Sequence, residues 1–161
     1  MKVIDNFLSD EEFKDVSKVL MGDNFPWYFN SILTSEQRDK QFYFSNTLFC
    51  SSPPWNGKCA QFNVAQSILS HLKIETLYRI KTNCQPRTLF HRKSLYHIDY
   101  TCACFTAIFY VNTTNGWTEF KKGGKVKSVA NRMLIFDSNL EHRGVSCTDQ
   151  QTRVVINFNY E

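Results

Sequence analysis

Three residues of this chain, His97, Asp99 and His142, have the types and the spacing that a metal site requires. Successive side chains of an extended strand point to opposite faces, so the alternation around Ile98 places an imidazole and a carboxylate on one face. His142 follows Asp99 by 43 residues, which leaves room for the chain to go away and return through other strands. Two imidazoles and one carboxylate on one side of a metal, with the other side open, suit non-haem Fe(II) and O₂ chemistry.

Arg153 is a candidate for binding a negatively charged group beside this triad. It follows His142 by eleven residues, across a turn-forming segment at 148–151. An arginine that points inward from a strand can hold a carboxylate through two parallel charge-assisted hydrogen bonds. Val155 and Asn157 share its face at the strand period of two, so we expect them to border the same site.

The second half of the chain is predicted to supply the strands that position these residues. After Ile74 the sequence consists of short β-rich runs separated by turn-forming residues. These runs cover 77–84, 95–99, 106–112, 117–120, 125–129, 132–136, 144–147 and 152–160. Short strands of this kind, with helices packed on one sheet, are typical of a β-sandwich or jelly roll, whose inward-facing residues can build a site.

The first half of the chain is predicted to contain two helices. Ser9 and Glu12 form a capping box, and the helix that starts there should end at Gly22. An amphipathic pattern predicts a second helix over 58–72. Strands are expected at 3–4, 25–29 and 41–49.

The length and composition fit one globular domain. The chain has 161 residues, 42% of them hydrophobic and 15% aromatic, which argues against disorder. We predict a single domain over 1–161, in which 1–74 form a buttress of helices and strands and 75–161 form the jelly-roll core with the metal site. The net charge of +4 permits an acidic partner without requiring one.

The stretch from Tyr96 to Tyr160 resembles the 2-oxoglutarate and Fe(II)-dependent oxygenases, in particular their prolyl 4-hydroxylase-like branch. The resemblance rests on the motifs His97-Ile98-Asp99, Ala107-Ile108-Phe109-Tyr110-Val111-Asn112, Thr118-Glu119-Phe120, Leu134-Ile135-Phe136 and His142-Arg143-Gly144, and on Arg153 in the final strand. The whole chain is also similar to small members of this branch found in phages. The resemblance implies a mainly β fold with flanking helices (α+β), built on a double-stranded β-helix, which is a cupin-like jelly roll.

The resemblance also implies a role for each candidate residue. His97, Asp99 and His142 would hold Fe(II), and Arg153 would pair with the distal carboxylate of 2-oxoglutarate. Tyr110 matches a family tyrosine whose hydroxyl helps to bind that carboxylate. The implied reaction couples the oxidative decarboxylation of 2-oxoglutarate to succinate, with O₂ as co-substrate, to the hydroxylation of a prime substrate. Ascorbate is a further candidate cofactor.

Two positions depart from the family pattern. A tyrosine that is common one strand earlier corresponds here to about Gln85, which concerns the details of co-substrate binding. The glycine that commonly precedes the strand at 132–136 is Asn131, which concerns only a turn. Halogenases of the superfamily replace the carboxylate of the triad with a small residue, so the presence of Asp99 favours hydroxylation.

The substrate entrance is expected near a polar, irregular segment at 87–94, because this region borders the entrance in the family. The candidate entrance residues are Arg87, His91, Arg92, Trp117 and Asn157. An ordinary surface loop would have the same composition, so whether 85–96 form a lid stays open. The prime substrate also stays open among a peptide, an amino acid and another metabolite.

The cysteines and the absence of a signal segment indicate a reducing compartment. The N-terminal residues lack the apolar stretch of a secretory signal, and no apolar run reaches the roughly 20 residues that span a bilayer. We therefore expect six reduced cysteines and a cytoplasmic location, in the host cell if the gene belongs to a phage. No membrane partner is expected. The lysines at 121, 122, 125 and 127 fit a solvated hairpin, so a nucleic-acid partner is not expected either.

Other readings of the same residues are a non-catalytic, cupin-like module that binds a metal or small ligand, and a purely structural jelly roll in which the histidines are merely buried. Cys102, Cys104 and Cys147 could join the histidines in a zinc site. The Cys-x-Cys spacing is a poor match to structural zinc, so we expect these cysteines to be small buried hydrophobic residues.

Overall fold

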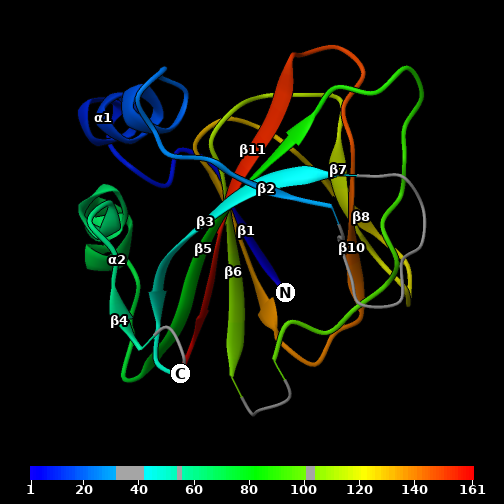
Figure 1. Cartoon of the computed structure of the whole chain (residues 1–161). Coiled ribbons are helices and arrows are strands. Elements are labelled where there is room, and N and C mark those ends of the chain that lie inside the picture. The colour runs from blue at the N-terminus through cyan, green and yellow to red at the C-terminus, as the bar shows by residue number, and fades with distance from the viewer. Residues whose placement is uncertain (32–41, 54–55, 101–103) are drawn as a thin grey trace.

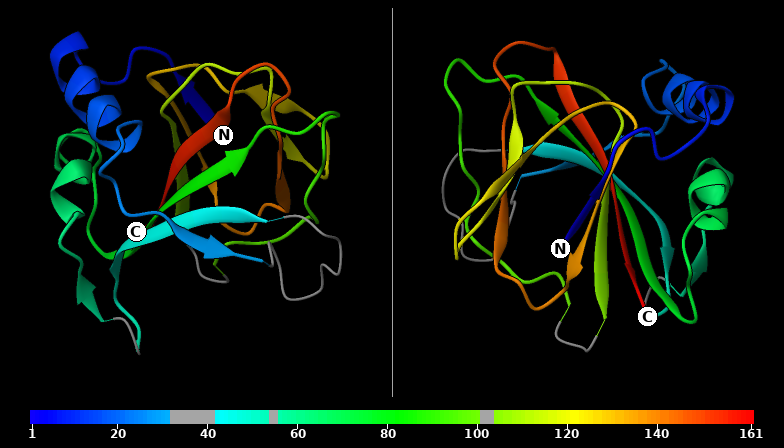
Figure 2. Two further views of the ribbon diagram at one scale, coloured as in Figure 1. Left: turned by 45° about the horizontal axis from the view of Figure 1, so that its top comes forward. Right: turned by 180° about the vertical axis from the view of Figure 1, so that it is seen from behind.

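The computed structural model describes residues 1–31, 42–53, 56–100 and 104–161. Two antiparallel sheets face each other, and two helices cover the outer side of the larger sheet (Figure 1). Seen from behind in Figure 2, the helices again lie on one side of the larger sheet and β7, β8 and β10 on the other. The predicted mainly β fold with flanking helices is confirmed, and the two facing sheets are those of a double-stranded β-helix.

The larger sheet has the strand order β1-β9-β6-β11-β5-β3-β2, with β4 paired to β3. Its strands are β1 (Lys2–Ile4), β2 (Tyr28–Asn30), β3 (Tyr43–Cys50), β4 (Gly57–Lys58), β5 (Leu77–Pro86), β6 (Phe105–Tyr110), β9 (Arg132–Asp137) and β11 (Thr152–Tyr160). The smaller sheet has the order β10 (His142–Val145), β7 (Trp117–Phe120), β8 (Lys125–Lys127). The helices are α1 (Asp10–Leu20) and α2 (Gln66–Ser70), and a 3₁₀ helix, η1 (Phe62–Ala65), precedes α2.

The two faces of the larger sheet bury different residues, because side chains alternate along each strand. On the outer face, Phe109 of β6 and Ile156 and Phe158 of β11 pack with the apolar sides of α1 and η1–α2. On the inner face, Tyr110 and Val155 pack with residues of the smaller sheet. The space between the two sheets is therefore only partly filled by apolar side chains, which leaves room for a site.

The capping box at the start of α1 is confirmed. The Glu12 backbone N–H donates to Ser9 Oγ at 3.3 Å, and the Ser9 backbone N–H donates to the Glu12 carboxylate at 3.0 Å. The helix ends at Leu20, two residues before the predicted glycine. The Glu12 carboxylate, held in this capping box, also lies near the residue that follows α2: His71 Nε2 is 3.1 Å from Glu12 Oε1.

Two predicted elements differ from the structure. The predicted helix over 58–72 is wrong in extent, since β4, η1 and α2 occupy this region. The Cys59 N–H donates to Leu48 O, which holds the chain extended along β3, and no side chain caps η1 or α2. The run at 95–99 does not form a strand but makes an isolated bridge to His142. Gln41, the expected start of the third strand, lies outside the described residues.

The cysteines differ in part from the expectation of reduced thiols. Cys50, Cys59, Cys84 and Cys147 are free. Cys104 is buried and disulfide-bonded, so the expectation is wrong at this position. Cys102 lies outside the described residues. None of the described helices is both long and apolar enough to cross a membrane.

Asn131 can occupy the turn before β9, where the oxygenases that the sequence resembles commonly have glycine. Its φ is 59°, a left-handed conformation that asparagine adopts more readily than most residues. Its side chain accepts from the Leu8 N–H at 2.9 Å and donates to the Leu8 carbonyl at 2.8 Å. The asparagine therefore keeps the turn and also ties the segment before α1 to the larger sheet.

We predict that Asn131→Ala lowers the free energy of unfolding by about 2–4 kcal/mol, because it leaves the buried Leu8 backbone groups unpaired and strains the turn. Asn131→Gly should cost less, because glycine keeps the left-handed conformation and loses only the side-chain bonds. Urea denaturation of both variants and the wild type measures the difference. Equal losses in the two variants would show that the turn conformation is unimportant.

We predict that the stabilising effect of Glu12 depends on pH. Hydrogen bonds from Ser9 and then from His71 lower the pKa of Glu12 to about 2 from an ordinary value of 4.5. A carboxylate whose pKa is lower in the folded state stabilises the protein above the ordinary pKa, and this effect is lost as the pH falls toward the folded pKa. Glu12→Gln should therefore have a lower melting temperature than the wild type at neutral pH. This difference in melting temperature should become smaller as the pH falls from 4.5 to 2.

Thermal melts across this pH range test the prediction. Glu11→Gln, an exposed change in the same turn of α1, is the matched control, and its melting temperature at neutral pH should differ less from that of the wild type. A difference for Glu12→Gln that stays constant with pH would contradict the assignment.

Candidate metal centre and co-substrate cavity

The two histidines of the predicted triad are joined through their backbones. His142 begins β10 of the smaller sheet, and His97 lies on the segment between β5 and β6. The N–H of His97 donates to the His142 carbonyl at 2.9 Å, and the N–H of His142 donates back at 3.0 Å. This bridge holds the two rings 4.7 Å apart between their centroids, although the segment at 97 is no strand.

Both imidazoles present the same nitrogen to the centre of the triad. His97 Nδ1 lies 3.2 Å from the Leu95 carbonyl, and His142 Nδ1 lies 2.9 Å from the Leu140 carbonyl. A carbonyl only accepts, so in a neutral ring Nδ1 carries the proton and Nε2 offers its lone pair. Burial lowers the pKa of His142, against the opposing effect of Asp99, and so favours the neutral ring that binds metals.

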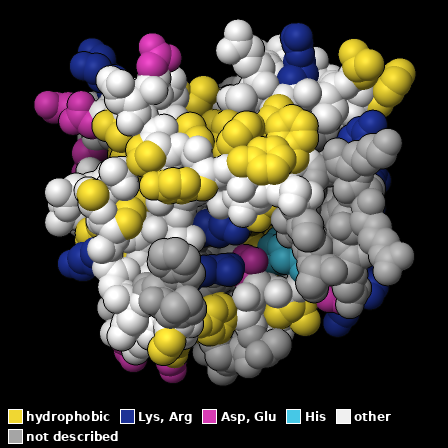
Figure 3. Space-filling view, viewed as in Figure 1, with side chains coloured by type: hydrophobic (Ala, Val, Ile, Leu, Met, Phe, Trp, Pro, Cys, Tyr) yellow, Lys and Arg dark blue, Asp and Glu magenta, His cyan; other side chains and the backbone are white. Residues whose placement is uncertain are grey.

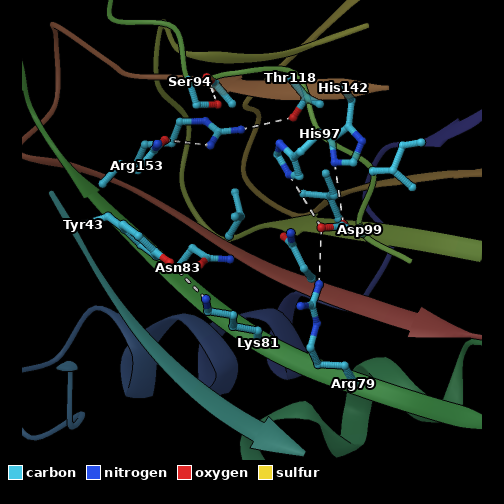
Figure 4. Close-up of a pocket in the computed structure, with 16 residues that line it drawn as sticks. Tyr43, Arg79, Lys81, Asn83, Ser94, His97, Asp99, Thr118, His142 and Arg153 are labelled. Carbon is cyan, nitrogen blue, oxygen red and sulfur yellow. Dashed lines mark hydrogen bonds and ion pairs between the residues drawn. The ribbon is translucent and has the colours of Figure 1, made fainter. Parts of the chain in front are cut away.

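The Asp99 carboxylate completes this centre. Its Oδ1 lies 3.6 Å from His97 Nε2, and its Oδ2 lies 3.6 Å from His142 Nε2. The ligand atoms of the three residues all lie within 4.8 Å of one another, and Figure 4 shows the side chains pointing toward one another. Oδ2 is buried and has no hydrogen-bond partner in the described part of the chain. A buried oxygen without a donor, facing two imidazole lone pairs, fits a bound cation.

Arg79 supports the carboxylate from β5, and the sequence analysis missed it. Its Nη2 lies 3.3 Å from Asp99 Oδ1, and its Nε donates to Asn159 Oδ1 at 3.0 Å. The contact leaves Oδ2 free for a metal. The signal was present in β5, where polar residues recur at 79, 81, 83 and 85 in a strand that pairs on both sides. Such an alternation indicates that one face of a central strand borders a polar cavity.

Arg153 is buried at the other end of the cavity, with 4% of its surface exposed. Its guanidinium donates to Ser128 at 2.7 Å, to Thr118 at 3.2 Å and to Gln85 at 3.3 Å, and all of these partners are neutral. Among the described residues, no carboxylate pairs with it. Burial lowers the pKa of Arg153, but a guanidinium stays charged in proteins. A buried cation whose described partners are all neutral is suited to bind an anion.

Glycine at position 116 makes room for this arginine. A Cβ atom on Gly116 would lie 2.8 Å from Arg153 Cδ and 2.8 Å from the Val145 carbonyl. Both distances are shorter than real Cβ contacts. A larger residue at 116 would therefore displace the arginine or the end of β10.

Tyr110 reaches the anion site through Thr118. The Tyr110 hydroxyl is buried and donates to Thr118 Oγ1 at 2.8 Å, and its ring lies 5.6 Å from the Arg153 guanidinium carbon. Burial raises the pKa of Tyr110, so the hydroxyl keeps its proton. Thr118 Oγ1 accepts from both residues, which leaves its own O–H to donate into the cavity. Direct contact of Tyr110 with a co-substrate stays a prediction, since of these two residues only Thr118 lines the cavity.

One cavity of about 260 Å³ connects the triad to Arg153. β11 and β5 form one wall of the cavity, and their register sets the order of residues along it. The pairs that lie opposite each other are Arg153 and Gln85, Val155 and Asn83, Asn157 and Lys81, and Asn159 and Arg79. The cavity is lined by Tyr43, Arg79, Lys81, Asn83, Gln85, Ser94, His97, Ile98, Asp99, Ile108, Thr118, His142, Gly144, Arg153, Val155 and Asn157. Figure 3 shows its mouth as a hollow with basic, acidic and histidine side chains at the bottom.

Of the predicted entrance residues, the structure brings only Asn157 to the cavity. Arg87, His91, Arg92 and Trp117 are not among its lining residues. His91 Nδ1 lies 2.7 Å from the Ser146 carbonyl and its ring packs 4.7 Å from that of Trp117, so this segment lies against the edge of the smaller sheet. A role for these four residues at the entrance stays a prediction.

Among the described residues, the triad is the only group of three or more histidine, cysteine or acidic side chains close enough to hold a metal. The zinc alternative therefore gains no support from Cys104 or Cys147. Cys102, its third member, lies outside the described residues.

Comparison with known proteins supports the fold. No protein-family model matches the sequence, and no curated protein matches it either. Among solved structures, the chain is similar to a 2OG-Fe(II) oxygenase family member from Burkholderia pseudomallei (TM-score 0.68, 7% identity, 98% of this chain and 84% of that one). It is also similar to a prolyl hydroxylase from Trichoplax adhaerens in complex with a peptide fragment (0.62, 16%, 99% and 82%) and a prolyl-4-hydroxylase from Pseudomonas putida (0.56, 13%, 99% and 91%).

We predict that a divalent metal such as Co(II) stabilises the protein through the triad. A metal at 100 times its Kd raises the free energy of unfolding by about 2.7 kcal/mol, which thermal melts with and without metal detect. Asp99→Ala and His142→Ala should lose this increment, because each removes a ligand. His71→Gln changes a histidine outside the cavity and should keep it. If metal still stabilised Asp99→Ala to the same extent, the Asp99 carboxylate would not be a metal ligand.

Proposed function

We propose that the protein is an Fe(II)- and 2-oxoglutarate-dependent dioxygenase that hydroxylates its prime substrate. The observation that carries the proposal is one cavity with a His-Asp-His centre at one end and, at the other, a buried arginine that has no anionic partner among the described residues. The fold of solved 2OG-Fe(II) oxygenases and prolyl hydroxylases adds support. Bound iron would supply O₂ activation: of the four electrons that reduce O₂, two would come from the oxidative decarboxylation of 2-oxoglutarate to succinate and CO₂ and two from the prime substrate, which is thereby hydroxylated.

The residues of this chain divide the work of binding. His97, Asp99 and His142 would hold the iron, with the proton of each imidazole fixed on Nδ1 by a backbone carbonyl. Arg153 would pair with the distal carboxylate of 2-oxoglutarate, and the Thr118 hydroxyl has a proton left to donate to it. The two donors already contact each other at 3.2 Å, so they are positioned before the co-substrate binds, which lowers the entropic cost of binding.

The prime substrate is proposed to be an amino acid, either free or within a peptide. This finer assignment rests on the resemblance to the prolyl 4-hydroxylase-like branch and on the likeness in fold to prolyl hydroxylases, one of them solved with a peptide. Fold alone says little about substrate, so a panel of substrates must test it. The use of ascorbate and the cytoplasmic location stay predictions.

Arg153 also separates this proposal from a non-catalytic, cupin-like module. A module that only binds a metal has no need of a second, buried charge, and burying a charge without an ionic partner is costly. Metal binding without any affinity for 2-oxoglutarate would favour the module instead.

We predict that the wild type forms succinate from 2-oxoglutarate with Fe(II) and O₂, slowly even without a prime substrate. Asp99→Ala should abolish this turnover. Arg153→Met, which keeps the bulk and removes the charge, should raise the KM for 2-oxoglutarate by about 10- to 100-fold, because a hydrogen-bonded charge pair is lost.

A co-substrate without the distal carboxylate provides the control. The wild type should prefer 2-oxoglutarate strongly over 2-oxopentanoate, and Arg153→Met should lose most of this preference. An unchanged preference would show that another residue binds the distal carboxylate, and full turnover by Asp99→Ala would refute the proposed metal site.

A further inference from the structure

The cavity wall beside the triad carries a lysine that the proposed function does not use. Lys81 lies on β5, two residues from Arg79, which contacts Asp99. Neighbours on one face of a strand are about 7 Å apart, so Lys81 is one such step from the residue that supports the metal-binding carboxylate. In Figure 4 the polar ends of Lys81 and Tyr43 meet at the cavity.

Lys81 and Tyr43 together present hydrogen-bond donors to the cavity. Lys81 Nζ donates to the Tyr43 hydroxyl at 3.1 Å and lies 5.2 Å from the centre of its ring. An ammonium has three N–H donors, and no carboxylate among the described residues pairs with this one. The Tyr43 hydroxyl accepts from Lys81 and therefore keeps its own proton to donate. This pair suits an incoming anion.

The charges that line the cavity lead to the same conclusion. Three cations (Arg79, Lys81 and Arg153) face one carboxylate, Asp99. Fe(II) adds two positive charges and 2-oxoglutarate two negative ones, so binding of both leaves the excess unchanged. Arg79 is paired with Asp99, and Arg153 would be paired with the co-substrate. The charge of Lys81 then has no counterpart until the prime substrate binds.

Asn157 places a further hydrogen-bonding group beside Lys81. It is directly opposite Lys81 in the register of β11 and β5 and lines the same cavity. Its Oδ1 is buried and accepts no hydrogen bond within the described protein. An oxygen without a donor next to an ammonium fits a ligand that has an N–H group close to a carboxylate, as every amino acid does.

We propose that the prime substrate carries a carboxylate, which Lys81 binds together with the Tyr43 hydroxyl. This inference rests on the proposed function and deepens it. It favours a free amino acid or the last residue of a peptide over a residue inside a peptide, because only these have a free α-carboxylate. A side-chain carboxylate has the same chemistry, and the experiment distinguishes the two sources.

Binding without turnover provides the direct test. The protein is loaded with Mn(II) and saturating 2-oxoglutarate in the absence of O₂, and calorimetry measures the affinity for each amino acid and its N-acetyl derivative, each compared with its α-amide. We expect at least one acid to bind about tenfold more tightly, or better, than its amide. Retained affinity of only the Asp or Glu α-amides would assign the side-chain carboxylate. Amides that bind as well as acids, or a panel in which no acid binds, would overturn the proposal.

Variants at Lys81 test the residue itself. Lys81→Met keeps the apolar stem, and we expect it to weaken binding of the preferred acid about tenfold or more while leaving its amide unchanged. Lys81→Arg should restore part of the affinity. Lys125→Met removes an exposed lysine of β8 outside the cavity and is the matched control. Thermal melts of each variant show whether it folds, and unchanged acid binding in folded Lys81→Met would overturn the assignment.

Two measurements on the wild type separate this inference from the proposed function. They are the affinity for 2-oxoglutarate and the formation of succinate without a prime substrate. When both are found and no carboxylate in the panel binds, the inference about Lys81 is wrong and the oxygenase proposal stands. When neither is found, the oxygenase proposal is wrong, and the inference falls with it.

Discussion

The register between β5 and β11 is the constraint on which the whole site depends. It sets Arg153 opposite Gln85 at one end of a shared face and Asn159 opposite Arg79 at the other. Side chains alternate with a period of two, so a shift of one residue would turn every polar group on this face toward the apolar core beneath the helices. The same pairing therefore fixes both ends of the cavity and the distance between them.

The charged groups at the two ends of the cavity, Asp99 and Arg153, have different kinds of partners. Asp99, with 7% of its side chain exposed, has Arg79 as an ionic partner at Oδ1, but its Oδ2 accepts no hydrogen bond from any described residue. Arg153 has three neutral partners and, within the part of the chain that the structure describes, no anionic one. Burying charges with incomplete pairing costs stability, and such groups cluster where a protein binds ligands. Both observations are the expected features of a site organised for a cation and an anion.

The larger sheet separates stability from chemistry by using its two faces. Ile156 and Phe158 of β11 lie on the face that packs under the helices, within the larger apolar cluster. Val155 and Asn157 of the same strand face the cavity. The helices and the outer face supply the apolar burial that drives folding. The inner face can then carry polar and charged side chains that a core would not tolerate.

Spacing within the sequence predicted what depends on local geometry. The arginine at 153 and the capping box at Ser9 each follow from the period of a strand or the end of a helix, and the mainly β fold followed from the pattern of short runs. The side chains at 97 and 99 do converge, but this segment is not a strand, and an isolated bridge to His142 positions it. The predicted helix over 58–72 failed because pairing with β3 holds the start of this segment extended, which no local period reveals. Arg79, Lys81 and Thr118 were missed as cavity residues for a related reason.

Sequence by itself determined which side chains share a face of each strand. Only the tertiary structure decided which faces meet, because strand pairing joins residues far apart in the chain and depends on the packing of the whole sheet.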